Sequence, residues 1–73
     1  MIVINKKKTA ETIKNKTKAC HISVNDICDA CYVSVQAVYK WFNGTSYPNL
    51  DNLAVLADIC GCKIDDFIVT DNI

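Results

Sequence analysis

Cysteine is the residue type in this chain with the greatest capacity for chemistry, because five cysteines occur among 73 residues. Two short spacings, Cys28-x-x-Cys31 and Cys60-x-Cys62, resemble those that supply thiolates to zinc. The same positions, however, continue helical apolar stripes, the first with Ile27 and the second with a leucine-rich run. A free cysteine behaves as a small buried hydrophobe, and an odd count without a secretory signal argues against a disulfide framework. We therefore predict core thiols, no metal and no cofactor.

The remaining candidates for catalysis are sparse. His21 is the only histidine, and it lies between two expected helices, where we predict an exposed side chain. No acid or nucleophile is arranged around it by spacing, and the chain has no glycine-rich loop to cradle a phosphate. The sequence therefore favours a protein that is not an enzyme.

Apolar spacing and capping residues predict an all-α fold of five helices. We expect Thr9 as the first N-cap with Glu11 in the first turn, Ser23 and Asp26 as a capping box, and Ser34 as the third cap. The expected helices cover residues 9 to about 19, 23 to about 32, 34–43, 49–60 and 64 to about 69. We expect residues 1–8 to form an N-terminal extension, extended in conformation because of Ile2-Val3-Ile4, and residues 9–73 to form one domain.

The second and third of these helices are joined by a very short link. Only Tyr32 and Val33 separate the second helix from the cap of the third. So short a link forces the two helices to cross steeply, which is the geometry of a helix-turn-helix.

Two helices carry the expected core. In the third helix Val38, Trp41 and Phe42 recur at helical spacing, and we expect Phe42 to be buried near Thr17 of the first helix. The buried face predicted for the fourth helix consists of Leu50, Leu53, Ala54, Leu56, Ala57 and Cys60.

The charge is balanced in total but uneven along the chain. The net charge is zero, yet residues 1–18 contain six lysines and only Glu11, whereas residues 41–73 contain five aspartates and only Lys63. One end of the chain could thus face an anion, although lysines on solvated helix faces are also common.

No apolar run approaches the roughly 18 residues that cross a bilayer. The N-terminus also lacks the order of charged and apolar residues that a signal peptide has, so we expect a cytoplasmic protein.

At this level of detail the chain resembles the Cro/repressor-type helix-turn-helix proteins, also called the XRE family. The resemblance rests on the run from Val33 to Gly44, above all Trp41-x-Asn43-Gly44, followed by Tyr47-Pro48 and the fourth helix. It covers residues 9–69 and implies a compact five-helix, lambda-repressor-like DNA-binding domain. In that family the third helix lies in the major groove of double-stranded DNA, and many members are transcriptional repressors.

The resemblance also implies which side chains meet DNA. Base-facing positions correspond to Ser34, Val35, Gln36, Tyr39 and Lys40. Phosphate-facing positions correspond to Ser23, Val24, Asn43, Thr45 and Ser46. Gln36 can bridge adenine N6 and N7, and Lys40 can meet a guanine or a phosphate.

Three departures from the family pattern affect these expectations. Many members have Gln where Val24 stands and a polar residue where Val35 stands; Val35 could instead touch a thymine methyl group. Many also pair an Arg in the first helix with a Glu, at positions that here hold Thr17 and Phe42. Both charges are absent together, which avoids leaving one of them buried and unpaired.

Two further questions stay open from the sequence. A protein-interaction module, such as an antitoxin or an accessory subunit, would use the same fold, and the neutral charge, Val24 and Val35 lean in that direction. A homodimer is expected, formed either through an apolar patch of Val55, Ile59, Val69 and Ile73 or through Ile2-Val3-Ile4.

Overall fold

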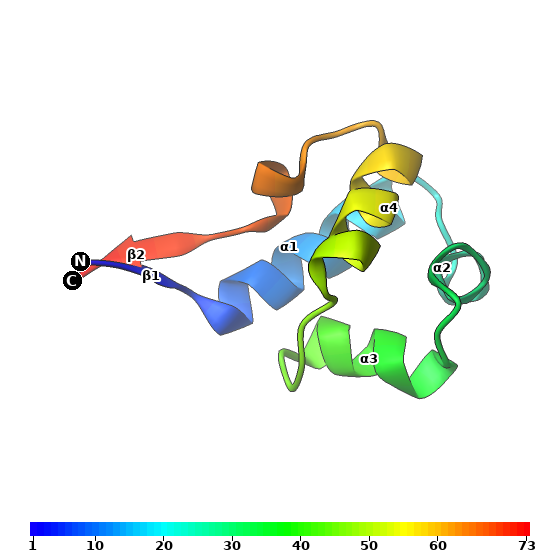
Figure 1. Ribbon diagram of the computed structural model, residues 1–73, viewed down its shortest axis with the longest axis horizontal. Helices are drawn as coiled ribbons and strands as arrows, with labels where there is room; N and C mark the ends of the chain where they lie inside the picture. Colours follow the sequence, from blue (N-terminus) through cyan, green and yellow to red (C-terminus); the bar gives the residue numbers. More distant parts are fainter.

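Four α-helices, one 3-10 turn and a two-stranded β-ribbon make up the computed structural model, which describes residues 1–73 (Figure 1). In chain order they are β1 (Ile2–Ile4), α1 (Lys6–Ala19), α2 (Val24–Cys31), α3 (Val35–Asn43), α4 (Leu50–Cys60), η1 (Ile64–Phe67) and β2 (Thr70–Asn72). The expectation of a mainly helical fold is confirmed. The count of five helices is wrong, because the segment after Gly61 forms only the 3-10 turn η1.

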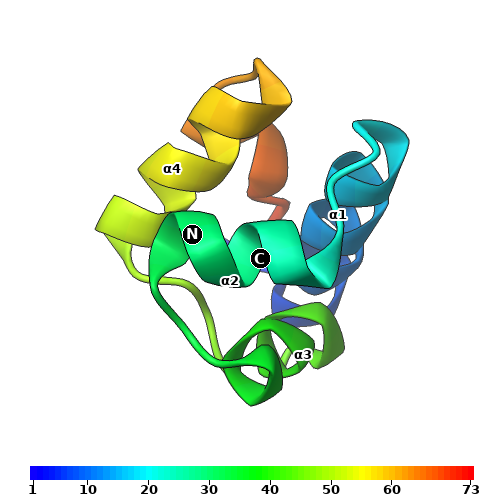
Figure 2. The ribbon, with the colours of Figure 1, turned by 90° about the vertical axis from the view of Figure 1, so that its right-hand side faces the viewer.

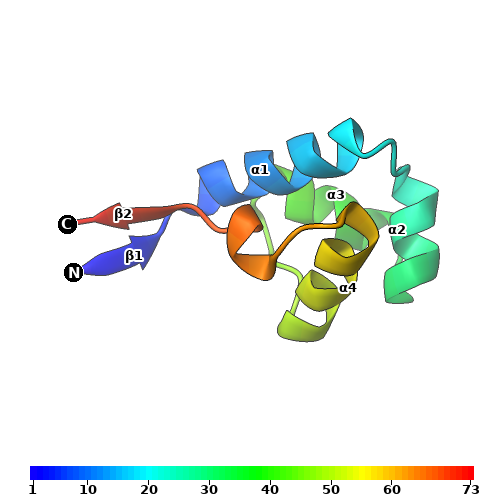
Figure 3. The ribbon, with the colours of Figure 1, turned by 90° about the horizontal axis from the view of Figure 1, so that it is seen from above.

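The turn η1 is short because the residues that follow it form hydrogen bonds with α1 instead of continuing a helix. Val69 donates its N–H to Thr9 Oγ1 at 3.0 Å, and the Thr9 hydroxyl lies 3.3 Å from the Val69 carbonyl oxygen. The segment from Ile68 onward is therefore extended, and β2 pairs antiparallel with β1, with Val3 opposite Asp71. Figure 3 shows the ribbon projecting from the helical body, with both chain ends at its tip.

The first helix begins three residues before its predicted cap. Asn5, and not Thr9, is the N-cap, and its Oδ1 accepts from the Lys8 N–H at 2.9 Å. Glu11 consequently lies beyond the first turn. Thr9 cannot serve as a cap because its side chain is buried and bonded to Val69. The predicted N-terminal extension is thus divided into a strand and the first turn of α1.

The N-caps of the next two helices are as predicted. Ser23 Oγ accepts from the Asp26 N–H at 3.1 Å, while Asp26 Oδ2 accepts from the Ser23 N–H at 3.0 Å, which completes the capping box. Ser34 Oγ accepts from the Ala37 N–H at 3.2 Å at the start of α3. Both α3 and α4 end at a glycine in the left-handed conformation, Gly44 and Gly61.

The core lies where α1, α3, α4 and η1 meet, and α2 closes one end of it. Its fully buried members include Ile13, Val38, Leu56 and Phe67. On α4 the predicted stripe is partly wrong, since Leu50 is 74% exposed and Ala54 is also exposed. Val55, which was expected outside the stripe, packs against the core instead.

Phe42 lies beside α1 as predicted, but it is only partly buried. It lines a hollow together with Thr17, and its ring meets Tyr39 edge to face at a centroid distance of 6.3 Å. Thr17 is buried, and its hydroxyl bonds back to the Ile13 carbonyl oxygen at 2.9 Å within α1. The polar atom at this position is therefore satisfied without any charged partner.

Four of the five cysteines pack in or against the core, as predicted. Cys31 is a core member, and Cys28, Cys60 and Cys62 are packed against it, while Cys20 is exposed and its thiol lies 3.6 Å from the Cys60 carbonyl oxygen. Burial raises the pKa of the Cys31 thiol. Burial, reinforced by a hydrogen bond with Cys20, raises the pKa of Cys60 to about 12.

No cluster of three or more His, Cys, Asp or Glu side chains is arranged to hold a metal ion. None of the helices has the length and apolar character required to traverse a bilayer.

The difference in burial between the two phenylalanines predicts a difference in stability. Phe67→Ala should lower the free energy of unfolding by roughly 3–5 kcal/mol, because a fully buried ring leaves a cavity. Phe42→Ala should cost roughly 2 kcal/mol, since water already reaches part of its ring. Urea unfolding followed by the fluorescence of the buried Trp41 measures both. Equal costs would show that Phe42 is as deeply buried as Phe67.

Thiol exposure predicts the order of reaction with an aromatic disulfide reagent. The thiolate is the reactive form, so at pH 8 the exposed Cys20 should react first. The thiols with raised pKa values, Cys31, Cys60 and Cys62, should react much later. Cys20→Ser should remove the fast phase, and Cys60→Ser should leave it in place. A fast phase that survives Cys20→Ser would contradict the packing described for the other thiols.

Candidate nucleic-acid interface

The turn between α2 and α3 fixes the direction of the candidate recognition helix. Tyr32 adopts a left-handed conformation with φ 55°, and the Val33 N–H bonds to the Cys28 carbonyl oxygen at 3.2 Å. The chain then enters α3 at once through the Ser34 cap. Figure 2 shows the result, with α2 crossing in front of the core while α3 runs along the lower edge of the molecule. The predicted helix-turn-helix geometry is present.

One side of α3 is anchored and the other is free. Val38 and Trp41 are buried in the core, so the opposite side of α3 faces outward. Gln36 and Lys40 are exposed one turn apart, while Val35 and Tyr39 are 41% and 52% exposed. The five residues predicted to face bases therefore share one accessible surface, with the Ser34 hydroxyl engaged as the cap at its N-terminal end.

Three of the predicted phosphate-facing residues lie at the end of α3 and in the loop after it. Asn43 and Thr45 are exposed and Ser46 is partly buried. The backbone N–H groups of Thr45 and Ser46 both bond to the Lys40 carbonyl oxygen, at 3.0 and 3.3 Å, so the loop is a closed turn. Their side chains, and not these amides, are left to meet a ligand.

Gly44 sits at a close approach between this loop and α1. It has φ 77°, and a Cβ at this position would meet Ala10 Cβ at 3.6 Å and the Lys6 carbonyl oxygen at 3.7 Å. The start of α1 thus lies against the C-terminal end of α3. Lys6 Nζ lies 5.3 Å from the ring centre of Tyr47, which places its charge beside the loop.

The start of α2 flanks the other end of the interface. Ser23 is exposed, and together with Val24, Tyr39 and two lysines of α1, Lys14 and Lys18, it borders one hollow. Hydrogen bonds from the Ser23 N–H, then from its hydroxyl, hold the pKa of Asp26 below its usual value, so this carboxylate stays ionised at neutral pH. A negative charge in the first turn of α2 weakens the attraction of that helix end for a phosphate.

Three of these residues, all lysines, were not included in the predicted site. Lys6 was assigned to an N-terminal extension, and Lys14 and Lys18 lie in the lysine-rich part of the chain formed by residues 1–18. The four-residue spacing of Lys14 and Lys18 puts them on one side of α1, but which side meets α3 depends on how the two helices pack. Their position beside Tyr39 and Ser23 is known only from the structure.

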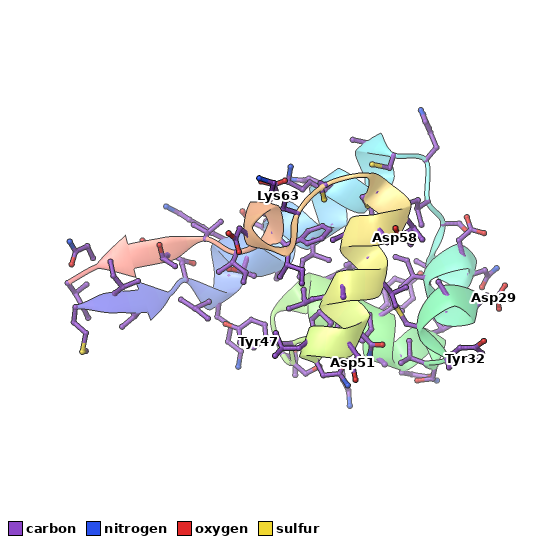
Figure 4. The ribbon with its side chains drawn as sticks, turned by 45° about the horizontal axis from the view of Figure 1, so that its top comes forward. Asp29, Tyr32, Tyr47, Asp51, Asp58 and Lys63 are labelled. Atoms are coloured by element: carbon purple, nitrogen blue, oxygen red, sulfur yellow. The ribbon has the colours of Figure 1, made fainter.

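The carboxylates are concentrated elsewhere. No acidic residue occurs between Asp29 and Asp51, a stretch that includes the whole of α3 and the following loop. In Figure 4, Asp58 and Lys63 lie at the end of α4 and on the segment after it, away from Tyr47, while Asp29 projects from the outer side of α2. α3 and the following loop thus add no negative charge of their own to this face, and the Asp26 carboxylate stands at the start of α2.

Comparison with known families agrees with this architecture. A family model described as helix-turn-helix matches residues 13–67, from the middle of α1 to the end of η1. Neither the curated proteins nor the solved structures gave a significant match. The matched region contains the α2–α3 turn, the buried Val38 and Trp41, and the free face of α3. The chain therefore belongs to the XRE-type helix-turn-helix family of DNA-binding regulators.

Proposed function

We propose that this protein reads a specific sequence in double-stranded DNA, with α3 in the major groove, and acts as a small transcriptional repressor. The observation that carries the proposal is the free face of α3, where Gln36 and Lys40 project one turn apart in a stretch without carboxylates. Amide and ammonium groups on a helix of this kind recognise the acceptors and donors of base edges. No enzymatic step is part of this function.

In the proposed complex the flanking residues position the helix without reading bases. Lys14 and Lys18 on one side and Lys6 on the other lie where the phosphates beside a major groove would pass, together with Ser23, Asn43, Thr45 and Ser46. Such contacts release counterions and make binding weaken with salt. Val35 supplies an apolar surface for a thymine methyl group.

A protein-interaction module is the second candidate, and three features favour it. Val24 and Val35 stand where many family members have polar side chains. Asp26 places a carboxylate beside Ser23, and the net charge is zero. An antitoxin or accessory subunit of this kind would use the same exposed face of α3 to bind another protein. Its binding would lack the steep salt dependence of phosphate contacts.

Substitutions on the two parts of the interface predict different responses. Gln36→Ala should weaken binding to the preferred duplex by roughly 1–3 kcal/mol, leave binding to a scrambled duplex nearly unchanged, and keep the salt slope. Lys14→Ala or Lys18→Ala should weaken both duplexes alike and reduce the slope by about one unit. Lys40→Ala should follow the Gln36 pattern.

The measurement is a salt titration on a duplex selected from a random library and on its scrambled version. Lys63→Ala is the matched control, because it removes an exposed lysine far from α3 and should leave both curves unchanged. If the parent protein binds neither duplex at low salt, the DNA-binding proposal fails and the interaction module replaces it.

We also infer a homodimer that tightens on DNA. Two copies that insert α3 into successive major grooves need half-sites about 10 base pairs apart, centre to centre. Selected sequences should accordingly be two-fold symmetric, and native mass spectrometry should find two chains per duplex. Complexes with one chain on every selected sequence would contradict the dimer.

A further inference from the structure

The apolar patch expected for a dimer is not assembled in the structure. Val55 is packed against the core, Val69 lies at the base of the ribbon, and Ile73 is at its tip, bonded to Met1. Figures 1 and 3 show the tip of the ribbon far from α4. These residues cannot form one surface, so the contact between copies must be sought elsewhere.

The ribbon offers such a surface at the edge of β1. Ile73 donates its N–H to the Met1 carbonyl oxygen at 2.8 Å, and Asn5 donates its N–H to the Val69 carbonyl oxygen at 2.7 Å. Because bonded pairs alternate in an antiparallel ladder, the backbone groups of Ile2 and Ile4 point away from β2. They form a row of free donors and acceptors, ready to pair with another strand.

The side chains of this edge are apolar and exposed. Ile2 and Ile4 lie on one face of the ribbon, and 64% and 53% of their surfaces are exposed. That face continues into a groove of about 340 Å³, lined by Ile4, Tyr47, Pro48, Leu50 and Leu53 among others. The high exposure of Leu50, at the mouth of the groove, leaves a further apolar side chain without a partner.

We propose that two copies of this chain dimerise by pairing β1 with β1 of the second copy, antiparallel, which joins the two ribbons into one four-stranded sheet. The two-fold axis passes between the two Val3 residues. In this register Ile2 of each copy lies opposite Ile4 of the other, and the four isoleucines cover one another at the mouths of the two grooves. The proposal rests on the dimeric state included in the proposed function, but not on DNA contact.

Charge selects the β1 edge over the other edge of the ribbon. Pairing through β2 would set Asp71 opposite Asp71 of the second copy, and like charges directly opposite are destabilising. Pairing through β1 sets two β-branched valines opposite each other, which is a favourable cross-strand pair. Residues 1–5 contain no charged side chain, and in this register Lys6 falls outside the paired segment.

The test uses a cross-link at the proposed axis. Two opposite residues in a non-hydrogen-bonded pair have Cα atoms about 4.5 Å apart, which is within the range that a disulfide spans. Val3→Cys, in a Cys20→Ser background that removes the exposed thiol, should therefore form a covalent dimer on mild oxidation with glutathione disulfide in the absence of DNA. Peptide mass spectrometry should locate the bond between the two introduced thiols.

Matched variants identify the edge. Ile2→Pro deletes an outward-pointing N–H of β1 and should abolish the cross-link of Val3→Cys, whereas Thr70→Pro deletes the equivalent N–H of β2 and should not. Circular dichroism checks that each variant retains its helices.

Two results would overturn the proposal: no cross-link with Val3→Cys, or a cross-link of Val3→Cys that survives Ile2→Pro but is lost with Thr70→Pro. Salt-dependent DNA binding by the parent protein in either case would leave the proposed function standing and remove only this interface. A cross-link without any DNA binding would establish the interface and reject DNA recognition.

Discussion

The short connection of two residues between the end of α2 and the Ser34 cap of α3 is the constraint on which the candidate interface depends. Tyr32 takes up a left-handed conformation that non-glycine residues seldom adopt, and its side chain is almost wholly exposed, so it adds little packing in return. The adjoining helices keep it there, because the inner face of α3 is held in the core by Val38 and Trp41. With the inner face fixed and the turn too short to adjust, the outer face of α3 has only one direction in which to point. The positions of Gln36 and Lys40 follow from that.

Elements defined by local signals could be predicted from the sequence, and those defined by distant contacts could not. The limits of α2, α3 and α4 are encoded by Ser23, Ser34 and the glycines that end α3 and α4, whose effects operate within one helical turn. Thr9 has the chemistry of an N-cap, but its hydroxyl is bonded to the backbone of Val69, sixty residues away, and Asn5 takes the cap. The partner of Ile2-Val3-Ile4 was equally hidden, because Thr70-Asp71-Asn72 is a polar segment with no strand pattern of its own.

The candidate site divides in the same way. The spacing of residues on α3 and the family resemblance were sufficient to predict which of its side chains face outward. Spacing and resemblance were not sufficient to predict which residues the lysines of α1 approach. Their neighbours depend on the close packing of α1 against Gly44 and on the hollow that Phe42 shares with Thr17. For Leu50 the spacing was misleading. It matches the buried stripe of α4, but the N-terminal turn of that helix extends past the core, so the side chain is exposed.

Zero net charge and an anion-binding face are compatible here because the charges are separated in space. At distances beyond roughly 8–10 Å in physiological salt, the fields of the lysines and aspartates are screened, and their sum is near zero in any case. Close to the surface, α3 and the loop after it contribute no carboxylate, and Lys14 and Lys18 lie near Ser23, which is hydrogen-bonded to Asp26. Such a protein gains little from long-range attraction to DNA of any sequence, so the part of its affinity that does not depend on sequence should be small. In the proposed complex, most of the discrimination then falls to the few side chains that would reach base edges, and the proposed second copy on an adjacent half-site becomes the main means of increasing affinity.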